Sequence, residues 1–361
     1  MKCIVINKKN IIITNLIVYF LIFMFLTNSK TCILTISGST NIFLTKLLPA
    51  LMPYILLTEL IINLNIIDNL SFGFSKIICK LFRVPKCAAS TIIISYLLGY
   101  PNAAKHIKNL YEAHKIDNTT CKKLVAFTNN ASPAYIIGTI GIAMFNNIYI
   151  GIILLVSHMF ASIIIGISYN SNKIIIQQNN LISNSFNKIS FSFDIILKSL
   201  INSVKTLSII WGYTVIFSLL PSLVLSKITL PNHVYGLILG MFEISNGINM
   251  LASDTKNFIL SISLISFVLS FSSLMVIMQI YSFVYKINIK LGYIIKYKLI
   301  HGLLSSVITY IIVRLFIGPE MLPVFANADG RLVSKPILSI VYIIIASITA
   351  ILLVLCQKKK R

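Results

Sequence analysis

Two polar clusters decide the fold of this chain, Gly99-Tyr100-Pro101-Asn102-Ala103-Ala104-Lys105 and Asn129-Asn130-Ala131-Ser132-Pro133. Each cluster interrupts sequence that is otherwise apolar. In a membrane, an interrupted helix is tolerated only where the backbone packs within protein or lines an aqueous cavity. We therefore take these two clusters as the first candidates for a binding site.

The composition places both clusters in a membrane protein. The 361 residues are 57% hydrophobic and only 11% charged, whereas soluble domains carry about 25% charged residues. Several apolar runs reach the roughly 17–25 residues that a helix needs to cross a bilayer. The sequence therefore predicts an all-α polytopic membrane protein whose surroundings are the lipid bilayer.

The strong positive charge does not indicate a nucleic-acid partner. The net charge is +22, but the basic residues lie in short segments between apolar runs, as the positive-inside rule predicts. Their distribution favours cytoplasmic N- and C-termini. No basic module with interleaved aromatic residues occurs, so we expect no nucleic acid to bind.

The sequence also predicts neither an enzyme nor a bound metal or cofactor. The six cysteines show no Cys-x-x-Cys spacing and are interpreted as free thiols. His106 and His114 lack the acidic or thiolate cluster that would complete a metal site. His158 lies within an apolar run and is expected to be a hydrogen-bonded packing residue. A coupling ion, either a proton or sodium, stays open.

The apolar runs and the connections between them divide the chain into five parts. These are an N-terminal transmembrane helix in 1–30, a first repeat in 40–170, a polar linker in 171–190, a second repeat in 191–317, and a C-terminal transmembrane helix with a basic tail in 337–361.

Each repeat contains a short helix and a broken span. Residues 87–98 are too few to cross a bilayer before Gly99, and basic residues follow, which predicts a re-entrant hairpin on the cytoplasmic side. Residues 234–251 are again short and are broken at Glu243, which predicts a hairpin that enters from outside. Broken spans follow the two hairpins, at 124–145 and 258–284. Further spans are expected at 42–64 and 299–317, and the basic segment 286–298, with Lys296 and Lys298, is expected to be a cytoplasmic loop.

Short and interrupted segments at matching places in two inverted halves are typical of inverted-repeat secondary transporters. The transporter-like bundle would have two re-entrant helical hairpins and broken transmembrane helices. The alternative is an ordinary helical bundle whose polar residues only hydrogen-bond between helices.

Two charged residues are the sharpest candidates for a site. Lys105 lies one turn beyond Pro101, where a helix N-terminus would add its positive dipole end and favour a carboxylate. The alternative is that Lys105 snorkels to the cytoplasmic interface. Glu243 is an acid in an apolar run, which suggests function; the alternative is a structural salt bridge to a lysine such as Lys205. The predicted substrate-binding set is Tyr100, Asn102, Lys105, Asn129, Asn130, Ser132, Glu243, Ser245, Asn246, Ser272 and Gln279.

Five motifs, at 47–59, 99–105, 129–133, 243–247 and 270–279, taken in order, resemble the sporulation integral membrane protein family YlbJ, also called SpoVV. The first cluster looks like the family's Gly-Tyr-Pro-x-Gly-Ala-Lys motif, and the second matches Asn-Asn-x-Ser-Pro. The resemblance covers about residues 40 to 315. Two positions depart from the family pattern, because Ala103 replaces a glycine and Ser272-Ser273 replaces Gly-Gly.

The resemblance implies a nucleoside-recognition or gate-type membrane domain, similar in plan to concentrative nucleoside transporters. It implies that the protein passes dipicolinic acid, a small dicarboxylate, from the mother cell across the outer forespore membrane. Two alternatives stay open: a transporter of nucleosides or other small metabolites with the same architecture, and a non-transporting scaffold for sporulation complexes. A homo-oligomer is also left open.

Overall fold

The computed structural model describes residues 15–16, 18–19, 22–23, 25–64, 66–169, 192–225, 228–253 and 257–316. These residues contain helices and connections and no strand, which confirms the all-α prediction. Most of the expected N-terminal helix, the linker in 171–190 and the C-terminal helix in 337–361 lie outside the described residues.

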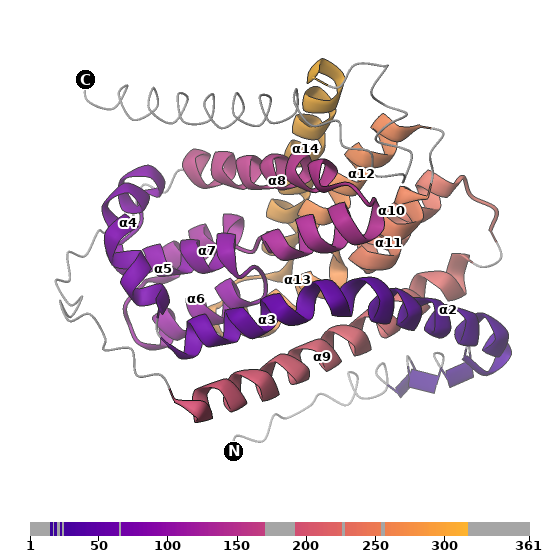
Figure 1. The fold of residues 1–361 in the computed structure, drawn as a ribbon, viewed down its shortest axis with the longest axis horizontal. Coiled ribbons are helices and arrows are strands. Elements are labelled where there is room, and N and C mark those ends of the chain that lie inside the picture. Colours follow the sequence, from indigo (N-terminus) through magenta and orange to yellow (C-terminus); the bar gives the residue numbers. More distant parts are fainter. Residues whose placement is uncertain are drawn as a thin grey trace.

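The described helices fall into two groups along the chain (Figure 1). The first group is α2 (Ser29–Ile42), η1 (Phe43–Leu47), α3 (Leu48–Asn63), α4 (Ile66–Phe82), η2 (Lys86–Ala88), α5 (Ala89–Leu97), α6 (Asn102–Glu112), α7 (Asn118–Phe127), η3 (Ala134–Met144) and α8 (Ile148–Ser168). The second group is α9 (Phe193–Leu225), α10 (Asn232–Phe242), α11 (Ile244–Ala252), α12 (Phe258–Phe271), α13 (Ser273–Val284), η4 (Tyr285–Ile287) and α14 (Leu291–Phe316).

Five helical stretches in the described part of the chain are long and apolar enough to cross a membrane. They are Ser29–Asn63, Ile148–Ser168, Phe193–Leu225, Phe258–Ile287 and Leu291–Leu315. Large apolar side chains such as Leu57, Ile209 and Leu303 are exposed on their outer faces, where lipid rather than water is the compatible solvent. These features support a multi-pass membrane protein.

Two span boundaries differ from the sequence-based expectation. The helix expected from residue 42 begins already at Ser29, and α14 begins at Leu291 rather than near Leu299. Consequently Lys296 and Lys298, expected in a cytoplasmic loop, lie inside α14. Lys296 is exposed, but Lys298 is buried. A count of apolar residues places the start of α14 too late in the chain, because it treats every lysine as a loop residue.

Each group contains a helical hairpin at the expected place. In the first, the Thr91 hydroxyl of α5 lies 2.8 Å from His106 Nδ1 of α6, so the two helices run antiparallel with Gly99 near their tip. In the second, α10 and α11 touch backbone to backbone, because a Cβ atom on Gly247 would lie only 2.1 Å from the Gly240 Cα. Both hairpins are followed by an interrupted helix and then a long helix, α8 or α14.

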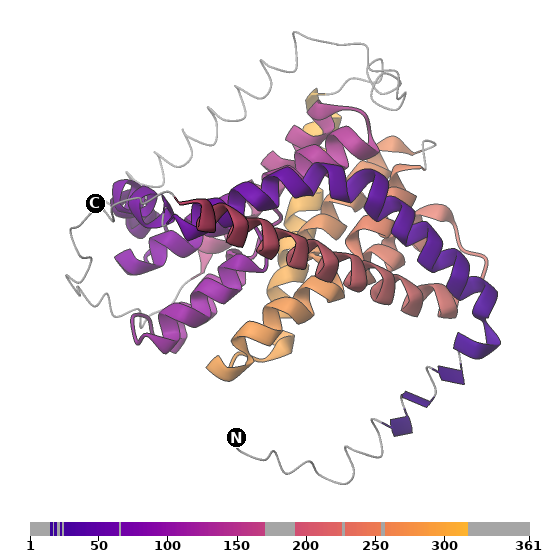
Figure 2. The same cartoon turned by 60° about the horizontal axis from the view of Figure 1, so that its bottom comes forward.

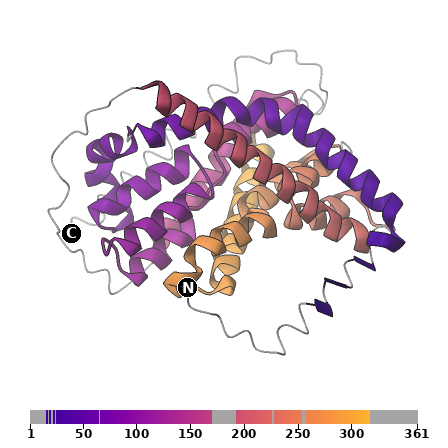
Figure 3. The same cartoon turned by 90° about the horizontal axis from the view of Figure 1, so that it is seen from below.

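Helices that occupy corresponding places in the two groups lie side by side and run antiparallel. The end of α3 lies against the start of α9, where Asn63 donates to Ser199 Oγ. The end of α8 lies against the start of α14, where the Tyr293 and Tyr169 hydroxyls are 3.0 Å apart. Figures 2 and 3 show that α9 crosses α2–α3, and that this pair lies across the other helices of both groups.

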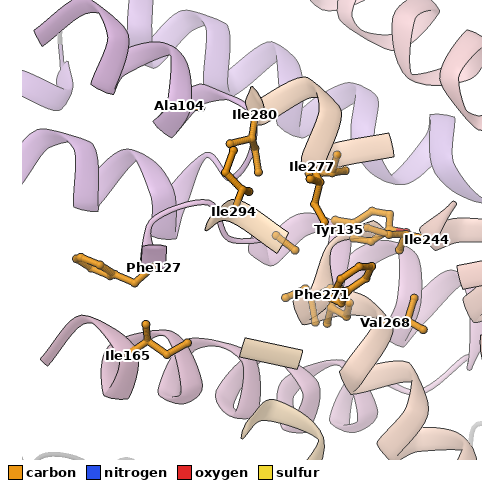
Figure 4. Packing of buried hydrophobic residues seen from close by; sticks show 14 of the residues in the cluster. Ala104, Phe127, Tyr135, Ile165, Ile244, Val268, Phe271, Ile277, Ile280 and Ile294 are labelled. Carbon is orange, nitrogen blue, oxygen red and sulfur yellow. The ribbon is translucent and has the colours of Figure 1, made fainter. Parts of the chain in front are cut away.

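The core lies where the interrupted helices of the two groups meet. Tyr135 of η3, Ile244 of α11, Phe271 of α12 and Ile277 of α13 are buried in one cluster (Figure 4). Close packing and interhelical hydrogen bonds, rather than hydrophobicity, hold helices together inside a bilayer. The large buried cluster therefore includes residues on both sides of the interruptions.

Candidate functional site

The first interruption is the non-helical segment 128–132, between α7 and η3. Asn129, Asn130 and Ala131 are completely buried. The tip of the first hairpin holds this segment in place, because the Tyr100 N–H donates to the Asn130 carbonyl at 2.8 Å. Gly99 has a φ of +74°, and a Cβ atom there would lie 2.8 Å from the Ser132 nitrogen. The two clusters singled out in the sequence are therefore in direct contact.

The second interruption consists of Ser272 and Ser273, between α12 and α13. Their φ angles are +70° and +53°, in the left-handed region that favours glycine. Glycine adopts this conformation without a steric cost, whereas serine does so less readily. Neither a side-chain cap nor a proline covers the N-terminus of α13, so its positive dipole end faces the interruption.

His158 of α8 joins the two interruptions. Its Nε2 accepts a hydrogen bond from the Ala131 N–H at 3.0 Å, and its Nδ1 lies 2.7 Å from Ser270 Oγ. Because a backbone N–H can only donate, Nε2 must be unprotonated, so a neutral imidazole carries its proton on Nδ1 and donates it to Ser270. The expectation of a hydrogen-bonded histidine is confirmed, but this histidine holds the site together.

The imidazole of His301, on α14, lies beside that of His158, with 4.6 Å between the ring centres. His301 Nε2 is 2.9 Å from the His158 carbonyl oxygen, which can only accept, so Nε2 carries the proton. The two histidines sit where the antiparallel helices α8 and α14 cross. Sequence reasoning did not identify His301.

Lys298 makes the second connection between the interruptions. Its ammonium group donates to the Asn129 carbonyl and, at 3.0 Å, to Ser272 Oγ. No acidic side chain among the described residues pairs with it. Sequence reasoning placed Lys298 in a loop. Its signal was the helical spacing of the buried polar residues of α14: Lys298, His301, Ser305 and Thr309.

The two asparagines present acceptors to the site. The Asn129 amide nitrogen donates to the Val125 carbonyl, and that of Asn130 donates to the Phe127 carbonyl. Those carbonyls only accept, so both amide orientations are fixed. Asn129 Oδ1, Asn130 Oδ1 and Ser273 Oγ are buried without a hydrogen-bond partner in the described protein. Buried polar atoms normally have partners, which makes these three atoms candidates for ligand contacts.

Glu243 forms the tip of the second hairpin and caps α11. Its carboxylate accepts hydrogen bonds from the Ser245 and Asn246 N–H groups at 2.9 and 2.7 Å, and from the Asn246 side chain at 2.8 Å. The Tyr135 hydroxyl lies 3.1 Å from Ser245 Oγ and ties this tip to η3. The tips of both hairpins therefore adjoin the first interruption.

One curated protein provides a comparison. The chain is 23% identical, over 293 residues that cover 72% of each chain, to the "Sporulation integral membrane protein YlbJ" of Bacillus subtilis (strain 168). The two proteins are distant relatives. No protein-family model and no solved structure matches the chain. The similarity to YlbJ agrees with the motif resemblance and is independent of the geometry above.

The structure brings together most of the predicted site. The residues that it joins through the contacts above are Tyr100, Asn129, Asn130, Ser132, Glu243, Ser245, Asn246 and Ser272. Lys105 is exposed on α6, and Asn102 reaches only the Leu98 carbonyl. No described contact links the Gln279 side chain to the site.

The salt bridge considered for Glu243 does not form. Lys205 is exposed on α9, and backbone and side-chain N–H groups satisfy the Glu243 carboxylate instead. Within the described residues, no three His, Cys, Asp or Glu side chains gather as a metal site would require.

Proposed function

We propose that this chain is a sporulation membrane transporter that carries a small dicarboxylate, dipicolinic acid, from the mother cell across the outer forespore membrane. The printed name of its distant relative supports a role in sporulation. The observation that carries transport is the buried junction of two helix interruptions, one from each half, bridged by Lys298. A buried cation inside a membrane protein marks a substrate or ion pathway by default.

The arrangement of helices supports an inverted repeat. The same order of hairpin, interrupted helix and long helix occurs twice, and corresponding helices run antiparallel. The start of α14 contacts Lys122 near the start of α7, whereas its Thr309 contacts Ser266 of α12. The bases of the two hairpins thus lie toward opposite ends of α14, as two re-entrant hairpins from opposite sides require.

In this proposal, transport proceeds by alternating access. The interruptions and hairpin tips form a midplane site that is open to one side at a time. Lys298 and the N-terminus of α13 attract the carboxylate, while the buried polar groups of the first interruption orient the molecule. Lys105 would act only at the mouth of the pathway, because its side chain is exposed.

The test is uptake of radiolabelled dipicolinate by liposomes that contain the purified full-length chain. We expect uptake above that of empty liposomes, and imposed proton or sodium gradients identify the coupling ion. Asn130→Ala and Glu243→Gln are expected to reduce uptake, with exposed Lys205→Ala as the control. Uptake equal to that of empty liposomes under every gradient would refute the transport function.

A second candidate substrate is a nucleoside. The unpartnered amide oxygens of Asn129 and Asn130 suit the hydroxyl and N–H donors that a nucleoside carries. Competition separates the candidates: an excess of unlabelled nucleoside leaves dipicolinate uptake unchanged if dipicolinate is the substrate. Uptake of a radiolabelled nucleoside that excess unlabelled dipicolinate does not inhibit would favour the nucleoside.

A further inference from the structure

Lys298 is buried, and its ammonium form has no counter-charge in the described structure. Both of its partners, the Asn129 carbonyl and the Ser272 hydroxyl, are neutral. No described contact joins Lys298 to the buried acid Glu243, whose carboxylate caps α11 instead. Since an uncompensated buried charge is costly, the site is complementary to one negative charge.

The same segment also requires a hydrogen-bond donor. Asn129 and Asn130 each keep an unpartnered amide oxygen, and their amide nitrogens are held by carbonyls and hydroxyls. A fully ionised dicarboxylate offers these oxygens only further acceptors. Lys298 donates to the backbone carbonyl of Asn129 itself. The ammonium that favours an anion and the two amide oxygens that need a donor therefore lie together, at Asn129 and Asn130.

We propose that the site binds its dicarboxylate as the singly protonated monoanion, and that each substrate molecule therefore carries one proton across the membrane. This inference rests on the proposed function, because it presupposes a small dicarboxylate substrate. The carboxylate accepts a hydrogen bond from the Lys298 ammonium, replacing the Asn129 carbonyl or the Ser272 hydroxyl. The carboxylic acid O–H donates to the amide oxygen of Asn129 or Asn130.

This scheme conserves protons, and apart from the one O–H bond no covalent bond of the substrate changes. The second carboxylate takes a proton from water on the side of entry and returns it to water on the side of release. The unpartnered Ser273 hydroxyl and the N-terminus of α13 give further donors to the carboxylate that remains ionised. The loaded site then has no net charge, because the Lys298 ammonium is paired with the one ionised carboxylate of the substrate.

Other titratable groups border Lys298 and must be separated from the proton of the substrate. They are His158 from α8 and His301 from α14 itself, while the described contacts of α12 and α13 at the interruption are hydroxyls. Lys123 of α7 is directed to Tyr169 at the end of α8. Titration of these protein groups would change the binding of every anionic ligand alike.

The test compares two ligands on the purified full-length protein in nanodiscs from pH 5 to pH 8. One is dipicolinate, and the other is its monoamide, 6-carbamoylpyridine-2-carboxylate, which has one carboxylate and an N–H donor at every pH. We expect the Kd of dipicolinate to rise by about tenfold per pH unit once its second carboxyl is ionised, by proton linkage. Titration of Lys298 or of the histidines changes the Kd of both ligands alike, so the ratio of the dipicolinate Kd to the monoamide Kd should itself rise by about tenfold per pH unit.

Variants test the residue that the scheme depends on. Lys298→Gln is expected to weaken the binding of the monoamide by at least about tenfold, the loss of one charged hydrogen bond. Lys298→Arg retains the cation and the pH difference between the ligands. The matched control is Lys296→Gln on the same helix, where the exposed side chain leaves both Kd values unchanged.

The outcomes distinguish this inference from the proposed function. If dipicolinate binds with a Kd that is independent of pH and lower than that of the monoamide, the site takes the dianion. The inference is then wrong and the proposed function stands. If neither ligand binds the wild-type protein, the dicarboxylate function fails and this inference fails with it. The ligand comparison needs no variant, so misfolding of Lys298→Gln would not prevent the decision.

Discussion

Lys298 and Asn129 form the contact on which the chemistry of the site depends. The lysine donates to the asparagine's carbonyl, while the asparagine's own amide oxygen stays unpartnered. A polar group that is buried without a partner lowers stability. Such groups persist where they bind something, so the cost indicates function at this residue.

Asn129→Asp would supply the missing counter-charge from within the protein. We expect the new carboxylate to pair with Lys298, so the melting temperature rises or stays equal while dicarboxylate binding weakens at least about tenfold, by loss of a charged hydrogen bond. Thermal unfolding and ligand titration of the same sample measure both effects. Asn129→Ala is the control, because it weakens binding without adding charge. Tighter binding by the aspartate variant would contradict the assignment.

Asp117 caps α7 outside the membrane-spanning helices and has a predictable pH dependence. Burial raises the pKa of Asp117. Hydrogen bonds from Thr119 and Thr120 together lower it by more than burial raises it, so the pKa lies below its ordinary value of 3.8. A depressed folded-state pKa contributes stability above the unfolded-state pKa, and that stability is lost as pH falls through the folded-state pKa.

Asp117→Ala is therefore expected to lower the free energy of unfolding by about 0.5–2 kcal/mol at pH 7, the cost of losing an N-cap. The difference from wild type should shrink as pH falls from the unfolded-state pKa through the lower folded-state pKa, because the wild-type carboxyl takes up its proton there. Paired melting curves at pH 7 and pH 3 check this expectation. An equal difference at both pH values would show that the charge of Asp117 does not contribute.

Among the elements, the α10–α11 hairpin tolerates the least change. Gly247 packs on Gly240 so closely that a methyl group would overlap the facing backbone. Gly247→Ala must separate the two helices and displace the Glu243 tip, so we expect destabilisation of about 1–3 kcal/mol from overpacking together with loss of uptake. Gly212→Ala on α9 is the control, since nothing lies within 4 Å of its added Cβ. Melting temperature and uptake, measured for Gly247→Ala and Gly212→Ala, test this expectation.

The sequence identified the elements of the site better than their partners. Pro133, Asn129 and the serine cluster at 270–273 break apolar runs, so both interruptions could be predicted from helix-breaking chemistry. The cation that contacts both interruptions could not be predicted in this way. Lys105 is close to the first cluster in sequence but exposed, whereas Lys298 is distant in sequence and buried against it. Only the packing of α14 on α8 and α12 decides between the two lysines.

At the scale of the whole molecule, the proposed inversion predicts opposite exposure of the two hairpin bases. Lys115 follows the first hairpin, Asn232 begins the second, and both are exposed. In a variant without native cysteines, we expect Lys115→Cys and Asn232→Cys to react with a membrane-impermeant thiol reagent from opposite sides of sealed vesicles. Detergent permeabilisation, which exposes both, is the control. Labelling of both from the same side would exclude the inverted repeat.

The bridge that Lys298 makes also bears on the empty protein. Its bond to the Asn129 carbonyl crosses from the second half to the first, so the halves cannot separate without leaving the ammonium with the Ser272 hydroxyl alone. Under the proposed transport function, that cost falls on the return of the empty protein and not on the step in which a carboxylate accompanies the lysine. Exchange of substrate for substrate should therefore outpace net flux. Unlabelled dipicolinate outside preloaded liposomes should accelerate the efflux of label.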